Sequence, residues 1–270
     1  MNHLRREQAP VSGRVWEQLD DEVRRSLTTY LTARRVVDFE GPHGYELAAL
    51  NTGRTSPVHS VPGADVQVCT RTVQPLVEVR CPFTIAWSEI EALDRGATVV
   101  DLDPATAAAR AVATVEDSLV FEGFDAVGAD GLVSGEDDAI TVGPEPAMLT
   151  EAVARAVTML RNRGVDGPYA MAAGSRLYTD MIEASEDGYP VLRHLRLQLE
   201  GPVLWAPALD GAVVLSTRGG DFTLVVGEDL SVGYSRHDDA GVTFVLEETI
   251  AVRVDTPEAA VALRCDDARV

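Results

Sequence analysis

The segment 45–87 constrains the fold of this chain most, because it combines short β-type runs with few large apolar side chains. Its runs Val66-Gln-Val-Cys69 and Leu76-Val-Glu-Val79 have the composition of strands, and Gly, Pro and Ser residues separate them. A segment of this kind has difficulty burying a core of its own, since little apolar surface is available to offset the loss of backbone entropy. The pattern predicts an extended hairpin arm that either stays mobile or lies across a neighbouring subunit.

Three other segments have the apolar spacing of an amphipathic helix. The first is 14–35, and the second follows Asp103-Pro104, where Asp can cap the helix and Pro can take the first helical position. The third, after Pro146, is the clearest helix of the chain. The apolar stripe of the first segment is Trp16, Leu19, Val23, Leu27, Tyr30 and Leu31. That of the second is Ala108, Ala111, Val112, Val115 and Leu119, and that of the third is Leu149, Ala152, Val153, Ala156, Val157 and Leu160. The charged face predicted opposite the first stripe contains Asp20, Asp21, Arg24 and Arg25.

Two long strands are predicted near the C-terminus, at 222–226 and 242–254, and strands alternate with helices between 167 and 220. With 270 residues, 46% of them hydrophobic, the chain has enough apolar side chains for one large domain or two small ones. The mixture of elements assigns it to the α+β class.

The charge balance argues against several functions. The chain has 23 basic and 43 acidic residues, a net charge of −20, so it has no basic stripe with which to bind a phosphate backbone. All the basic residues are arginine, which excludes Schiff-base chemistry and a phosphate-binding lysine loop. No apolar run has the length of a membrane span or a signal peptide, so we expect a cytoplasmic location and neither membrane nor nucleic-acid partners.

No arrangement of residues predicts catalysis or a metal site. The five histidines are dispersed, the three cysteines have no metal-ligand spacing, and the odd number of cysteines fits reduced thiols. Ser175 follows Ala-Gly, which fits the start of a helix better than a hydrolase nucleophile. We therefore expect a protein that is not an enzyme and that holds no metal and no cofactor.

Two longer segments carry a family resemblance. The stretch 217–234, which contains Arg218-Gly-Gly-Asp221, and the stretch 36–49 resemble encapsulin nanocompartment shell proteins of family 1, the linocin or bacteriocin-like group. Shorter pieces follow in the same order over residues 1–263: Gln8-Ala-Pro10, Arg95-Gly96, Glu116-Asp117 and Gly167-Pro-Tyr169. Their joint spacing carries the resemblance, because each piece alone is an ordinary turn sequence.

The resemblance implies the α+β fold of tailed-phage major capsid proteins, the Hong Kong 97 type, with a P-domain, an E-loop and an A-domain. In that scheme the segments are an N-terminal arm and P-domain helix (1–45), the E-loop (46–81), the P-domain with its spine helix (82–131), the A-domain (132–222), the P-domain return strands (223–264) and an exterior tail (265–270). The E-loop of this fold lies across a neighbouring subunit.

The resemblance further implies a self-assembling icosahedral shell, of the smallest, sixty-subunit (T=1) kind. The shell would enclose a cargo enzyme, such as a dye-decolourising peroxidase or a ferritin-like protein, through the cargo's C-terminal targeting peptide. Without lysine the chain cannot form the lysine-to-asparagine crosslink of some phage capsids, so its contacts must be non-covalent. The alternatives are a phage-type capsid protein, which the charge disfavours, and a flavin-binding or protease-like enzyme.

Three sets of residues correspond to family sites. The cargo-peptide groove corresponds to Leu27, Leu31, Arg34, Asp38, Leu230, Val232 and Tyr234, although Leu27 and Leu230 are equally well explained as core residues. An electronegative pore loop corresponds to Glu183, Glu186, Asp187 and Tyr189, for which a solvated turn is the competing interpretation. The flavin site of some members corresponds to Arg80 and Trp87, but Trp87 is offset by one from the expected aromatic residue.

Overall fold

The structure is a computed structural model that describes residues 3–62, 65–133, 138–143, 146–186 and 188–265. Its strands are β1 (Asp38–Glu40), β2 (Ala49–Thr55), β3 (His59–Ser60), β4 (Gln67–Val68), β5 (Arg71–Pro75), β6 (Val77–Ala86), β7 (Gly123–Phe124), β8 (Ala129–Asp130), β9 (Ile140–Val142), β10 (Tyr169–Ala173), β11 (Ser185–Glu186), β12 (Tyr189–Pro190), β13 (Val203–Trp205), β14 (Ala212–Ser216), β15 (Phe222–Val226), β16 (Ser231–His237), β17 (Gly241–Val254) and β18 (Ala260–Cys265). Its helices are α1 (Gly13–Tyr30), α2 (Trp87–Asp94), α3 (Asp103–Phe121), α4 (Pro146–Asn162), α5 (Ser175–Glu183) and α6 (Val191–Leu199), with short 3-10 turns η1 (Arg6–Gln8), η2 (Ala33–Arg35), η3 (Asp125–Val127) and η4 (Pro257–Ala259).

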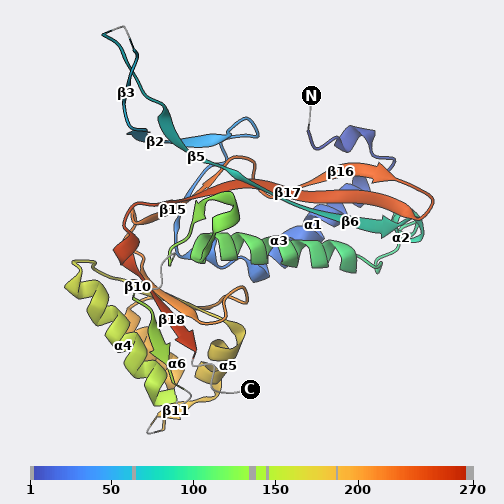
Figure 1. The fold of residues 1–270 in the computed structure, drawn as a ribbon. Helices are drawn as coiled ribbons and strands as arrows, with labels where there is room; N and C mark the ends of the chain where they lie inside the picture. The colour runs from blue at the N-terminus through green and yellow to red at the C-terminus, as the bar shows by residue number, and fades with distance from the viewer. Residues whose placement is uncertain (1–2, 63–64, 134–137, 144–145, 187, 266–270) are drawn as a thin grey trace.

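Two five-stranded sheets organise two adjoining parts of the molecule (Figure 1). In the first sheet β1 pairs with β15, and the long strand β17 pairs with β15 near its end, with β16 near its start and with β6 along residues 241–250. The second sheet has the order β13-β10-β14-β18-β9. Strand β18, which the predicted segment 223–264 groups with the return strands, pairs with β14 and β9 in the second sheet. The predicted segment therefore contributes to both sheets.

Strand β17 is the centre of the first sheet, and its residues from Gly241 to Val252 are all buried. Because side chains alternate along a strand, Phe244, Leu246 and Glu248 lie on one face. Phe244 packs edge-on against Trp16 of α1 at 5.2 Å between ring centroids, so this is the face that the helices cover. Glu248 therefore occupies a position in an otherwise apolar row.

The predicted helices are present, but they differ from the prediction in which side chains they bury and in where they begin and end. All six apolar positions of α4 from Leu149 to Leu160 are buried, as predicted. Helix α3 instead buries Glu116 and Asp117 and leaves two residues of its predicted stripe exposed, Ala111 and Val115, the latter by 43%. Its start also differs: the side chain of Asp101, not Asp103, accepts the first amide, at 3.0 Å.

Helix α1 ends at Tyr30, earlier than the predicted residue 35. The chain leaves the helix because the amides of Thr32 and Ala33 donate to the carboxylate of Asp117 on α3, at 3.0 and 2.8 Å. The Thr32 hydroxyl donates to the carbonyl of Trp205 at 2.7 Å. These contacts fix the turn that leads to η2.

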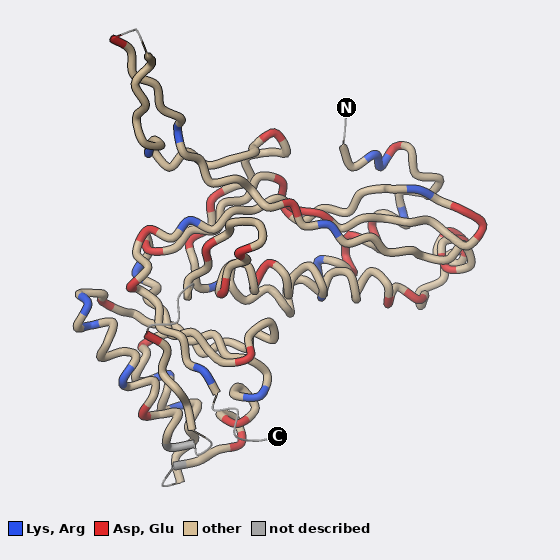
Figure 2. Tube along the Cα trace, viewed as in Figure 1, with Lys and Arg blue, Asp and Glu red and all other residues tan. Residues whose placement is uncertain are grey.

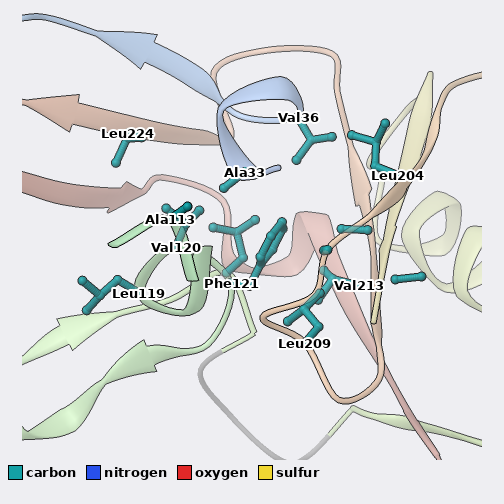
Figure 3. Close-up of a cluster of buried hydrophobic side chains, with 14 of the residues drawn as sticks. Ala33, Val36, Ala113, Leu119, Val120, Phe121, Leu204, Leu209, Val213 and Leu224 are labelled. Atoms are coloured by element: carbon teal, nitrogen blue, oxygen red, sulfur yellow. The ribbon is translucent and has the colours of Figure 1, made fainter. Parts of the chain in front are cut away.

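The two parts share one hydrophobic core. At their junction Phe121, at the end of α3, lies between Ala33 and Val36 on one side and Leu209 and Val213 on the other (Figure 3). Phe121 has no exposed surface. Close packing across the junction means that a shift of one part must disturb the other.

The segment 49–75 forms a narrow arm that projects away from both parts (Figure 1). Strands β2 and β5 pair antiparallel from Ala49–Pro75 to Thr55–Arg71, and β3 pairs with β4 further out. The arm carries few charged residues compared with the rest of the chain (Figure 2). The predicted extended hairpin is confirmed for 49–75, but the predicted bounds, 45–87 for the arm and 46–81 for the E-loop, are too wide. Residues 77–86 form β6, which pairs with β17 in the first sheet and buries Val79, Phe83 and Ile85.

Candidate functional site

A cleft of about 390 Å³ lies between α1, the turn that follows it and the start of β16. Five of the seven predicted groove residues line it: Leu27, Leu31, Arg34, Leu230 and Val232. Their side chains line one cleft because positions 27 and 31 lie on one face of α1 and of the turn after it, and the loop before β16 runs beside that face. Aliphatic side chains from both segments and several charged side chains, among them Arg6, Arg24 and Arg34, line the cleft together.

The other two predicted residues lie outside this cleft. Asp38 is on β1 and lines a separate cavity with Thr217 and Phe222, where its carboxylate accepts the amide of Gly220 at 2.6 Å. Tyr234 lies further along β16, and its hydroxyl is 2.6 Å from Nδ1 of His237. The structure therefore brings neither Asp38 nor Tyr234 to the lining of the cleft.

The N-terminal segment closes one end of the cleft. Arg6 donates from Nε to the carbonyl of Val232 at 2.8 Å and from Nη1 to Asp20 at 2.8 Å. Asp20 and Arg24 both line the cleft, which corrects their predicted place on the face opposite the apolar stripe. Positions 20, 23, 24 and 27 are three, four and seven residues apart, so one face of the helix carries them all.

Arg34 connects the cleft to a cluster of carboxyl groups below it. Its guanidinium donates to Glu116 at 2.7 and 2.8 Å, to Asp229 at 2.8 Å and to Glu248 at 3.2 Å. Burial lowers the pKa of Arg34, but the Glu116 and Asp229 carboxylates outweigh this effect and hold that pKa above its usual value. Arg34 is therefore a permanent cation at the cleft, and its position is fixed by three acidic partners.

Two of those partners have no exposed side-chain surface, namely Glu116 and Glu248, whereas Asp229 is 42% exposed at the cleft. Burial and the neighbouring Glu116 raise the pKa of Glu248 well above its usual value. Burial also raises the pKa of Asp117 to about 7, although the amides of Ala33 and Thr32 oppose the rise. Three adjacent acidic side chains thus support the turn that carries Arg34.

These supporting acids were not predicted as site residues, although sequence signals for two of them exist. Glu116 belongs to a quoted family motif and interrupts an apolar helix stripe, and Glu248 interrupts the strand 242–254. A charged residue in an apolar row indicates either solvent exposure or a specific partner. Their partner, Arg34, is 82 residues from Glu116 in the sequence, so the sequence alone could not pair them.

The predicted pore residues lie at the end of the second part that is remote from the arm (Figure 1). Glu183 ends α5, and Glu186 pairs with Tyr189 across the β11–β12 turn. Asp187 lies outside the described residues. The ring of Tyr189 is covered by the guanidinium of Arg193 at 5.3 Å, a neighbouring cation that the prediction missed.

The two predicted flavin residues are separated within one subunit. Arg80 pairs with Glu247 at 3.0 Å in the middle of β6, whereas Trp87 begins α2 and donates from Nε1 to the carbonyl of Asp238 at 2.7 Å. The two residues are seven positions apart along an extended segment, which corresponds to about 23 Å. Within the part of the chain that the structure describes, no cluster of His, Cys, Asp and Glu could hold a metal ion, and no helix has the length and apolarity to cross a membrane.

Comparison with solved structures supports a capsid-type fold. The virus-like particle protein from Pyrococcus furiosus superimposes with a TM-score of 0.66 over 93% of this chain and 99% of its own, at 16% identity. A chain from Mycobacterium phage Bobi gives a TM-score of 0.59 over 88% and 91% of the two chains, also at 16% identity. The predicted fold class is confirmed.

Comparison of sequences identifies the family. Residues 1–251 match the family model described as an encapsulating protein for peroxidase. The type 1 encapsulin shell protein of Rhodospirillum rubrum is 46% identical over 98% of this chain and 97% of its own length, and that of Mycobacterium tuberculosis is 40% identical over 97% and 99%. These relatives are structural proteins, as the sequence predicts for this chain. The chain belongs to the type 1 encapsulin shell proteins, which assemble into capsid-like shells.

Proposed function

We propose that this chain forms a sixty-subunit shell whose cleft between α1 and β16 binds the C-terminal targeting peptide of a cargo enzyme. A dye-decolourising peroxidase is the favoured cargo, since the matched family model is described as encapsulating a peroxidase. The observation that carries the proposal is the cleft of about 390 Å³ with aliphatic lining on both walls. A ferritin-like cargo would bind at the same cleft. The shell sequence therefore predicts that the ligand is a targeting peptide, but the sequence of that peptide, and so the cargo, belongs to another protein.

The chemistry of the cleft suits a short peptide with aliphatic anchors. Leu31 of the turn after α1 and Leu230 before β16 both line the cleft and are only partly buried, so they can contact inserted aliphatic groups. The arginines at the edges, Arg6 and Arg34, already pair with acidic residues of the chain itself. Binding energy is therefore expected from apolar burial, with the edge charges restricting the sequences that fit.

Co-expression tests the cleft directly. We expect a peroxidase with its C-terminal tail to sediment with the shells, and the same enzyme without its tail to stay in the supernatant fraction. Replacing Leu31 or Leu230 with aspartate places a charge in the apolar lining, so the peroxidase activity of the particle fraction should fall to the tailless level. Both residues are only partly buried, so the subunit should still fold and assemble.

Leu197→Asp is the matched control, because Leu197 is 66% exposed on α6 and lies outside the cleft. This variant should load as the unchanged chain does. Electron microscopy of each variant reports shell diameter, which also tests the sixty-subunit size. Normal loading of intact Leu31→Asp and Leu230→Asp shells would show that the tail binds elsewhere.

We also propose that the β11–β12 turn lines an acidic pore. Five copies of Glu183, Glu186 and Asp187 around a five-fold axis would attract cations and repel anions, while Arg193 beside Tyr189 weakens the field. The Glu183→Gln/Glu186→Gln double variant should therefore lower the ratio of cationic to anionic dye oxidised by the enclosed peroxidase. Glu151→Gln on the exposed face of α4 is the control. An unchanged ratio in the double variant would place solute entry at another opening.

A further inference from the structure

Below the cleft, two carboxyl groups meet where neither has access to water. Glu116 projects from α3 and Glu248 from β17, both side chains are 0% exposed, and Arg34 Nη2 donates to one oxygen of each, at 2.7 and 3.2 Å. Glu248 Oε2 accepts from Arg34 Nη2 at 3.2 Å, whereas its Oε1 is buried without a donor. Glu116 by contrast accepts from Arg34 through both oxygens, at 2.8 and 2.7 Å.

The charges that face this pair determine its protonation. Arg34 supplies one positive charge, while Glu116, Glu248 and Asp229 could supply three negative charges. Asp117, next to Glu116 on α3, lies against the same turn and accepts the amides of Thr32 and Ala33. Two ionised carboxylates in contact and out of water repel strongly, so one of them retains a proton at neutral pH. The proton belongs on Glu248, because Glu116 already accepts from Arg34 with both oxygens. Protonated Glu248 can then donate to Glu116.

We propose that Glu116 and Glu248 are positioning residues for the targeting peptide, and that the single proton they share keeps Arg34 in the geometry the cleft requires. This inference rests on the proposed function of the cleft. With the proton present, Glu116 holds one edge of the guanidinium and Asp229, at the cleft surface, holds another. The cation therefore stays at the wall of the cleft beside Leu230.

Loss of the proton changes these forces in a definite direction. A second negative charge below Arg34 repels Glu116 and Asp229 and draws the guanidinium inward, away from the cleft surface. The turn 31–34 carries both Leu31 and Arg34, so both walls of the cleft are affected. Peptide affinity should therefore fall as the pH rises through the ionisation of Glu248, by at most about tenfold per pH unit because one proton is involved.

Hydrogen exchange measured by mass spectrometry on loaded shells tests this step, since water reaches the interior of an assembled shell. The probe is the tailed peroxidase, and the readout is the extra protection of residues 23–34 relative to the empty shells obtained by co-expression with the tailless enzyme. We expect this protection to decrease as the pH is raised above neutrality in the unchanged chain, because burial and Glu116 raise the pKa of Glu248 well above its usual value. Asp117 also ionises near this range, since its pKa is about 7, but its ionised form accepts the amides of Thr32 and Ala33 more strongly and so opposes the decrease. Glu248→Gln cannot ionise, so it should keep the low-pH protection throughout.

Two further variants separate positioning from a general structural role. Glu116→Gln removes the neighbouring negative charge, so the decrease should move to lower pH rather than disappear. Glu122→Gln, at the end of the same helix and away from the cleft, should leave the profile unchanged. A pH-independent protection in the unchanged chain, or an unchanged profile in Glu248→Gln, overturns the inference. Absence of protection at every pH would instead contradict the proposed binding of the tail.

Discussion

Replacing Arg34 with alanine is expected to lower the unfolding temperature of the shell by about 10 °C. The substitution leaves Glu116, which has no exposed side-chain surface, buried without its cation. Breaking a buried ion pair from one side costs about 3–5 kcal/mol, and 1 kcal/mol corresponds to about 2–4 °C in a chain of this size. Differential scanning fluorimetry of assembled shells measures the shift.

The pH dependence of this effect has a predictable sign. Without Arg34 the buried carboxyl groups can bind protons and become neutral at low pH. The difference in unfolding temperature between Arg34→Ala and the unchanged chain should therefore become smaller as the pH falls. Arg253→Ala is the control, because Arg253 is 43% exposed and pairs with the exposed residues Glu40 and Asp255. Exposed pairs contribute about 0–1 kcal/mol. Equal shifts for the two variants would mean that the buried cluster does not stabilise the fold.

The periodic parts of the fold were accessible from the sequence, because local spacing determines them. The apolar positions of α4 recur at helical intervals and all six are buried. The strands 222–226 and 242–254 agree with β15 and β17. The arm could be predicted for the opposite reason, since a segment with few large apolar side chains cannot form a hydrophobic core of its own.

The remaining features depend on contacts between distant residues. Helix α1 ends at Tyr30 because Asp117, 85 residues from Thr32, accepts the amides that would otherwise extend the turn. Asp38 follows Arg34 by only four residues, yet β1 pairs with β15 and carries Asp38 to another cavity. Neither outcome has a local signal in the sequence.

The candidate site shows the same division. Leu27 and Leu31 share a helix face, so spacing alone places them together, whereas the family resemblance was needed to bring Leu230 and Val232 opposite them. The acidic support below the cleft escaped both kinds of reasoning. An acidic residue in an apolar row is either exposed or paired, and the sequence could not decide between these because the partner, Arg34, comes from a different segment of the chain.

Converting the valines of the arm to serine is expected to abolish shell assembly while leaving the subunit folded. Five valines of the arm are 37–55% exposed, and we propose that a neighbouring subunit covers them in the shell. They are Val58, Val61, Val66, Val68 and Val73. Burying the rest of each side chain contributes about 1 kcal/mol, repeated in every subunit. Sedimentation velocity measures the particle fraction, and circular dichroism measures the secondary structure.

Val99→Ser is the matched control, because Val99 is 89% exposed but lies outside the arm. It should assemble normally, which would show that the loss of assembly depends on valines in the arm and does not follow from replacing any exposed valine. A single substitution in the arm should reduce the particle fraction partially, since the other four valines still contribute. Because the arm shares little of the common core, its variants should keep the circular dichroism of the unchanged subunit. Full-yield particles from the five-serine variant would show that contacts of the two main parts, rather than the arm, hold the shell together.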